Sequence, residues 1–181
     1  MPLPFFTIGH STRTIADVVE LLRVGEVRMV VDIRTVPRSR TNPQYNGDIL
    51  GEALAPYQIG HCRIAALGGL RSRVREVPPE RNCWWTNRSF HNYADHALSE
   101  DFRTGLEELI AFGRERTVAM MCSEAVWWRC HRRIVADHLI ARGETVFHLM
   151  GGGRAEPARL SEGACMADGL VTYPAPPGPP S

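Results

Sequence analysis

Two cysteines and the residues beside them are the most reactive groups in this sequence. Cys122 lies two residues before Glu124, and Cys130 is followed directly by His131 and Arg132. A thiolate beside a histidine can act as a nucleophile, with the imidazole as its base. We expect Cys130 to begin a helix, whose first N–H groups favour a thiolate or an anion that Arg132 would clamp. The alternative is that the cysteine is a buried apolar residue and the arginine a surface charge.

These cysteines allow three kinds of site. With His10 and His131 they supply ligands that zinc or iron takes, but Cys-x7-Cys-His is not a recognised ligand spacing. In a covalent mechanism one thiol would be the nucleophile. The phosphatase pattern, a cysteine with an arginine six residues later, is missing because Trp128 occupies that position. In a sensor the two thiols would be oxidised. The pattern identifies no cofactor, and no residue is assigned as a metal ligand.

Other polar residues are candidates for proton transfer and anion binding. His10, Asp32 and Glu124 are the proton-transfer candidates. If the two carboxylates lie close together, the pKa of one of them is raised towards the range of a general acid or base. Arg34 and Arg38 suit a phosphate-bearing ligand. Equally, Asp32 can pair with Arg34 or His10, and the arginines can be surface charges. The other candidate substrate-binding residues are Ser11, Gly68, Gly69 and Tyr93.

Length and composition predict one ordinary globular domain. The chain has 181 residues, of which 44% are hydrophobic and 23% charged. A net charge of +1 argues against a general nucleic-acid coat. Five irregularly spaced cysteines do not suggest a disulfide framework. The N-terminus does not resemble a signal peptide, and no apolar run is long enough for a membrane span. We therefore expect a cytoplasmic protein without membrane contact.

Alternating apolar runs and amphipathic segments predict an α/β fold. The expected class is a three-layer sandwich with a mostly parallel sheet of about five strands and helices on both faces. Predicted strands lie within residues 5–9, 28–34, 59–67, 117–122 and 145–150. Predicted helices follow Thr14, cover about residues 48–57, surround residues 102–110 and cover about residues 130–142. Ligands bind such sheets beyond the carboxyl ends of the strands, where the candidate residues cluster.

Two segments do not show a regular pattern. Residues 70–92 contain Trp84, Trp85 and several arginines. Such a surface can stack bases and neutralise phosphates, although aromatic residues in a long loop more often anchor it to the core. The segment is also a candidate lid over the site. Residues 151–181 are predicted to be a partly disordered Gly/Pro-rich extension of a single domain formed by residues 1–150.

The chain resembles a known family over residues 5–150. The matching segments are Thr7-Ile8-Gly9-His10-Ser11, Val31-Asp32-Ile33-Arg34 with Pro37 and Ser39, Leu67-Gly68-Gly69, Phe90-x-x-Tyr93, and Met121-Cys122-x-Glu124 leading to Cys130-His131-Arg132. They are similar to the bacterial and archaeal domain of unknown function 488 (DUF488). The apolar segment Ala-Val-Trp-Trp-Arg departs from the polar residues that relatives often carry there. The resemblance implies the fold and the site, and it implies no particular reaction.

These observations support three functional hypotheses. The leading one is an enzyme that acts on a phosphate-bearing or other anionic substrate, such as a nucleotide or nucleic-acid component. The second is a non-enzymatic nucleic-acid-binding module that uses the basic and aromatic segment. The third is a redox or metal sensor that uses Cys122 and Cys130. The expected partner is a small anionic ligand or a nucleic-acid component, and the sequence does not predict an oligomeric state.

Overall fold

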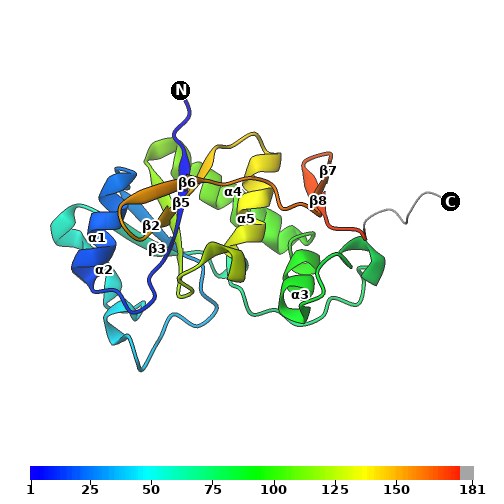
Figure 1. Cartoon of the computed structure of the whole chain (residues 1–181). Helices are drawn as coiled ribbons and strands as arrows, with labels where there is room; N and C mark the ends of the chain where they lie inside the picture. Colours follow the sequence, from blue (N-terminus) through cyan, green and yellow to red (C-terminus); the bar gives the residue numbers. More distant parts are fainter. Residues whose placement is uncertain (176–181) are drawn as a thin grey trace.

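The computed structural model describes residues 1–175 and contains a six-stranded sheet in the order β3-β2-β4-β1-β5-β6 (Figure 1). The strands are β1 (Phe5–Gly9), β2 (Met29–Asp32), β3 (Gly60–Arg63), β4 (Val118–Cys122), β5 (Val146–Met150) and β6 (Arg154–Pro157). The first five are parallel, and β6 pairs with β5 in the antiparallel direction. The α/β prediction is confirmed, but there are six strands rather than about five. Gly152 and Gly153 adopt positive φ angles that turn the chain back along β5.

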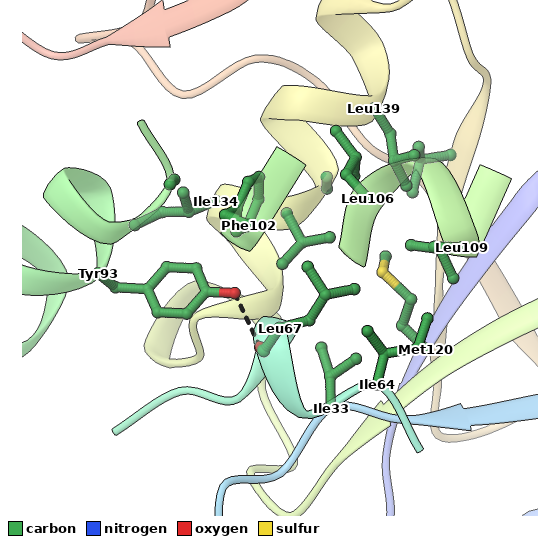
Figure 2. Packing of buried hydrophobic residues seen from close by; sticks show 14 of the residues in the cluster. Ile33, Ile64, Leu67, Tyr93, Phe102, Leu106, Leu109, Met120, Ile134 and Leu139 are labelled. Atoms are coloured by element: carbon green, nitrogen blue, oxygen red, sulfur yellow. Dashed lines mark hydrogen bonds between the residues drawn. The ribbon is translucent and has the colours of Figure 1, made fainter. Parts of the chain in front are cut away.

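Helices cover both faces of this sheet. They are α1 (Ile15–Val24), α2 (Leu50–Leu54), α3 (Arg88–His96), α4 (Glu100–Glu115) and α5 (Arg132–Ala141). On one face, α1 and α2 cover Ile8 and Val30, while the other helices lie on the opposite face (Figure 1). Figure 2 shows the hydrophobic cluster on this opposite face, in which Leu106 and Leu109 of α4 approach Met120 of β4. Alternate strand residues therefore enter different layers, as a doubly covered sheet requires.

Capping residues determine where several helices begin and end. The Thr14 hydroxyl accepts the N–H of Asp17 at 3.1 Å, as predicted, and α1 ends at Gly25. The predicted helix at residues 48–57 is shorter, because a 3-10 turn that contains Pro56 follows α2. Helix α3 was not predicted, and the Asn87 side chain caps it. None of the helices in residues 1–175 combines the length and apolar character of a membrane span.

Aromatic residues anchor the irregular segment that precedes α3. Trp85 is only 7% exposed and stacks on Phe90 with 4.9 Å between the ring centres. Trp84 contacts Trp85 edge-on, and Tyr173 contacts the same ring from the C-terminal segment. The two tryptophans therefore contribute to the core instead of forming an open stacking surface.

The segment after residue 150 also contributes to the core. Beyond β6 it forms a hairpin of β7 (Cys165–Ala167) and β8 (Leu170–Thr172). Val171 and Tyr173 are fully buried. The Tyr173 hydroxyl donates a 2.7 Å hydrogen bond to the buried carboxylate of Asp137 in α5. The disorder predicted for the end of this extension concerns residues 176–181, which lie outside the described residues.

Removing this hydroxyl should weaken the fold. We expect Tyr173→Phe to lower the free energy of unfolding by about 1–3 kcal/mol, because a buried oxygen of Asp137 loses its donor. Urea denaturation measures this value. Tyr57→Phe is the matched control, since Tyr57 is 39% exposed, and it should change stability by less than about 0.5 kcal/mol. Equal effects of the two substitutions would contradict this role for Tyr173.

Candidate functional site

A cavity of about 520 Å³ lies at the carboxyl ends of β1, β2 and β4. Eight of the candidate residues line it: His10, Arg34, Arg38, Gly69, Cys122, Glu124, Cys130 and His131. Its other lining residues are Thr35, Val36, Ser39, Leu70, Asn87, Ser89, Phe90, Ser123 and Arg129. The remaining candidates, Ser11, Asp32, Gly68, Tyr93 and Arg132, are not among its lining residues. Asn87 and Ser89 were not predicted as site residues because they lie at the start of helix α3, which has no clear sequence pattern, and Arg129 was not predicted although Cys130 follows it directly.

The two cysteines meet at the inner end of the cavity. Cys122 ends β4, Cys130 precedes α5, and their sulfur atoms are 2.6 Å apart. Burial raises the pKa of Cys130, but the hydrogen bond with Cys122 and the charge of Arg132 outweigh it and lower this pKa to about 7. The same hydrogen bond, together with burial, raises the pKa of Cys122 well above its usual value. Of the two thiols, Cys130 is therefore the one whose ionisation near neutral pH is favoured.

Arg132 is a fully buried cation beside this pair. Its Nη1 donates to Cys122 Sγ at 3.2 Å and to the Glu124 carbonyl at 2.6 Å, and its Nε donates to the Thr7 hydroxyl at 3.2 Å. Within residues 1–175 it forms no ion pair with a carboxylate. The two thiols are thus the acidic groups that contact it. Arg132 is fully buried and is not among the lining residues of the cavity, so it is not a surface charge.

His131 is oriented as a base for Cys130. Its Nε2 lies 2.8 Å from the carbonyl oxygen of Ile33, which can only accept, so Nε2 carries the proton. Nδ1 keeps its lone pair and lies 3.5 Å from Cys130 Sγ. Burial lowers the pKa of His131 and favours this neutral form. Gly69 permits the arrangement, since a Cβ there would lie 2.4 Å from Nδ1.

Tyr93 supports this histidine from the opposite side. Its ring is edge-on to His131 with 5.0 Å between the ring centres, and it is fully buried. Its hydroxyl donates a 2.8 Å hydrogen bond to the carbonyl of Leu67 (Figure 2). The structure therefore places Tyr93 as a residue that positions His131, whereas the sequence analysis assigned it to substrate binding.

Asp32 and Arg34 form a buried ion pair at the end of β2. Nε and Nη2 of Arg34 donate to the two carboxylate oxygens of Asp32 at 2.9 and 2.6 Å. Burial raises the pKa of Asp32, but the hydrogen bonds and the charge of Arg34 outweigh it and lower this pKa to about 2. Asp32 is ionised at neutral pH and has the structural role given above as the alternative to proton transfer. Its partner Arg34 is correspondingly neutralised.

His10 is also held by its neighbours. Its Nδ1 lies 2.8 Å from the Ser11 carbonyl and must donate to it, so Nε2 accepts from Arg34 at 3.3 Å. The ring stacks on Tyr45 with 4.1 Å between the centres. Ser11 itself has a φ of 48° and contributes its backbone to the turn. Burial lowers the pKa of His10, which is therefore neutral at the cavity wall.

The other candidates have simpler surroundings. The Glu124 side chain is exposed, and its backbone carbonyl holds Arg132. The Arg38 side chain is 73% exposed and lies 4.0 Å from Asp48. Gly68 packs under Thr35, since a Cβ there would lie 2.7 Å from the threonine hydroxyl oxygen. Arg38 and Glu124 thus remain available to a ligand, whereas Gly68 shapes the wall.

Cys122, Cys130 and His131 are also the one group in the described chain whose atoms could hold a metal ion, with ligand atoms within 4.8 Å of one another. His10, considered above as a fourth ligand, is not part of it. Tetrahedral zinc with bonds of about 2.3 Å separates two sulfur ligands by about 3.8 Å. The two sulfurs, 2.6 Å apart here, would have to separate to about that distance to hold such an ion.

Comparison with known proteins gives one match. A family model described as "Domain of unknown function DUF488" matches residues 14–139, which contain both cysteines, His131 and Arg132. No curated protein and no solved structure matches the chain. The matched region extends from the cap of α1 into α5 and therefore includes most of the cavity wall.

Proposed function

The chain belongs to the DUF488 family, and we propose that it is a thiol-dependent enzyme that acts on a small anionic substrate with Cys130 as the nucleophile. One observation carries this proposal: the buried guanidinium of Arg132 has the two thiols as its acidic contacts. An uncompensated buried charge costs several kcal/mol. One thiolate is therefore the charge that balances the site.

The neighbouring groups have separate roles in this mechanism. Cys130 reacts as the thiolate that Arg132 balances, and Nδ1 of His131 takes the proton from the fraction of Cys130 that is still a thiol and can return it to a leaving group. Arg132 stabilises the thiolate, and its bonds to the Glu124 and Ala125 carbonyls hold the loop that forms the cavity wall. The thiolate then forms a covalent bond with an electrophilic atom of the substrate in the cavity.

The cavity supports a small anionic substrate. Its volume of about 520 Å³ is within the usual range for small-molecule sites, about 300–1,000 Å³. Arg38 and Arg129 are exposed at its wall, whereas Arg34 is already neutralised by Asp32. Guanidinium groups of this kind bind carboxylates and phosphates in pairs of hydrogen bonds. A reducing cytoplasm, which we propose as the location, would keep both thiols free.

The nucleic-acid-binding hypothesis receives less support. It depended on Trp84 and Trp85 as stacking surfaces, but these rings contact each other, and Trp85 is covered by Phe90 and Tyr173. Rings in such contacts are not free to stack on bases. We therefore favour the thiol enzyme.

Chemical labelling tests this proposal. At pH 7, iodoacetamide should alkylate Cys130 at least tenfold faster than Cys62, whose pKa burial raises to about 11. Phosphate, a nucleoside monophosphate or a dicarboxylate should slow the reaction at Cys130 severalfold. The exposed Cys165 is the control and should react equally with and without anions. Mass spectrometry of the digested protein measures each site. An unreactive Cys130, or one that no anion protects, would contradict the proposal.

A further inference from the structure

The short distance between Cys122 and Cys130 has a chemical use of its own. A disulfide requires about 2.05 Å between the sulfurs, so a closure of about half an ångström from 2.6 Å would join them. The intervening loop is held in place, because Arg132 binds the carbonyls of both Glu124 and Ala125. Gly9 lets that loop approach β1, since a Cβ there would lie 1.8 Å from the Glu124 carbonyl oxygen. The pair is thus ready to bond with little rearrangement.

The two thiols have different surroundings. Cys130 lies beside the Nδ1 lone pair of His131 and accepts the backbone N–H of Arg132 at 3.4 Å. Cys122 lacks such a base and shares its proton with Cys130. In thiol–disulfide exchange, the thiol with the larger thiolate fraction attacks first, and its neighbour resolves the mixed disulfide. The geometry therefore assigns Cys130 the first step and Cys122 the second.

We infer that Cys122 is the resolving thiol and that the pair exchanges with a small anionic disulfide. This inference rests on the proposed function, because it requires Cys130 as the nucleophile. The volume of about 520 Å³ fits a ligand much larger than a hydroperoxide, and Arg38 and Arg129 at its wall suit the carboxylates of such a ligand.

The exchange balances without an additional oxidant. The Cys130 thiolate attacks one sulfur of the substrate, an S–S bond of the substrate breaks, and the first thiolate leaves. The Cys122 sulfur then attacks Cys130, the mixed disulfide breaks, and the second thiolate leaves with the proton of Cys122. One substrate thiolate, one substrate thiol that carries the Cys122 proton and one Cys122–Cys130 disulfide result, so the substrate gains the two electrons that the protein pair loses. A dithiol reductant restores the pair by the same exchange in reverse.

The test uses 5,5′-dithiobis(2-nitrobenzoate), an anionic disulfide whose released thiolate is coloured. The background variant carries Cys62→Ser, Cys83→Ser and Cys165→Ser, which removes the other thiols. It should release two coloured thiolates per protein and keep no adduct, and its mass should show a Cys122–Cys130 disulfide. Adding Cys122→Ser should give one thiolate and a stable adduct on Cys130. A lasting adduct on Cys130 while Cys122 is present would overturn the resolving role.

Further arms separate this inference from the proposed function. If iodoacetamide alkylates Cys130 at pH 7 but no disulfide forms, the inference fails and the nucleophile stands. If Cys130 reacts only after unfolding in urea, both fail. Arg38→Ala with Arg129→Ala should slow the anionic reagent severalfold and leave the neutral 4,4′-dithiodipyridine unchanged. Equal slowing of the two reagents would overturn an anionic disulfide as the substrate class. The same holds if hydrogen peroxide forms the Cys122–Cys130 disulfide faster than the anionic reagent does at equal concentration.

Discussion

Arg132→Met is expected to abolish most of the thiolate at Cys130 at neutral pH. The hydrogen bond with Cys122 and the positive charge of Arg132 hold the Cys130 pKa near 7, and the substitution removes that charge while it keeps the backbone N–H that donates to Cys130. Without that charge, burial acts against ionisation and raises this pKa. The rate of alkylation by iodoacetamide at pH 7 should fall at least tenfold and should recover above about pH 9.

The matched variant is Arg132→Lys, which keeps the charge but lacks the planar fork. One ammonium cannot hold Cys122 and the carbonyls of Glu124 and Ala125 in the same geometry. Its alkylation rate should lie between those of the wild type and Arg132→Met. Circular dichroism checks that both variants are folded. A Met variant that is folded and reacts like the wild type at pH 7 would contradict the role of the buried charge.

Asp32→Asn should have the largest effect on stability. The substitution leaves the guanidinium of Arg34, which is 6% exposed, without its carboxylate partner. Loss of one member of a buried ion pair costs about 3–5 kcal/mol. Denaturation by guanidinium chloride at pH 7 measures the change. Asp48→Asn is the control, because Asp48 is exposed and lies 4.0 Å from Arg38, and it should stay within about 0.5 kcal/mol of the wild type.

The ion pair of Asp32 and Arg34 also determines how the stability of the wild type and of Asp32→Asn depends on pH. The pKa of Asp32 is lowered from 3.8 to about 2 in the folded protein, so its contribution is present above about pH 4 and is lost as the pH falls towards 2. The wild type should therefore lose more stability than Asp32→Asn across this interval. Parallel pH curves, or equal costs for Asp32→Asn and Asp48→Asn, would contradict the assignment.

Local signals in the sequence were sufficient to predict the sheet and the edge of the sheet at which the candidate site lies. Buried strands are continuous apolar runs, and Thr14 begins a helix through its own side chain. Because parallel strands end at one edge, the residues after β1, β2 and β4 could be expected to converge. His10, Arg34 and Cys122 do line one cavity.

The remaining features depend on contacts between distant parts of the chain. The sequence predicts Arg132 to be an anion clamp or, as the alternative, a surface charge, and only the loop carbonyls and the thiols of the folded site explain its burial. Trp127 stacks on His148 of β5, with 4.6 Å between the ring centres, and this contact accounts for an aromatic residue in the loop. Tyr173 lies in a segment with weak local preferences and is held by Asp137. None of these partners is near in sequence.

Thiolate absorbance near 240 nm is the most direct test of the central claim, since it does not depend on access to the cavity. The wild type and Cys130→Ser should be titrated side by side, with the free thiols at Cys62, Cys83 and Cys165 replaced by serine in both. We expect a difference spectrum of one thiolate per protein with a midpoint near pH 7. If no thiolate appears at Cys130 until above about pH 9, the site does not hold a nucleophilic thiolate and the account is contradicted.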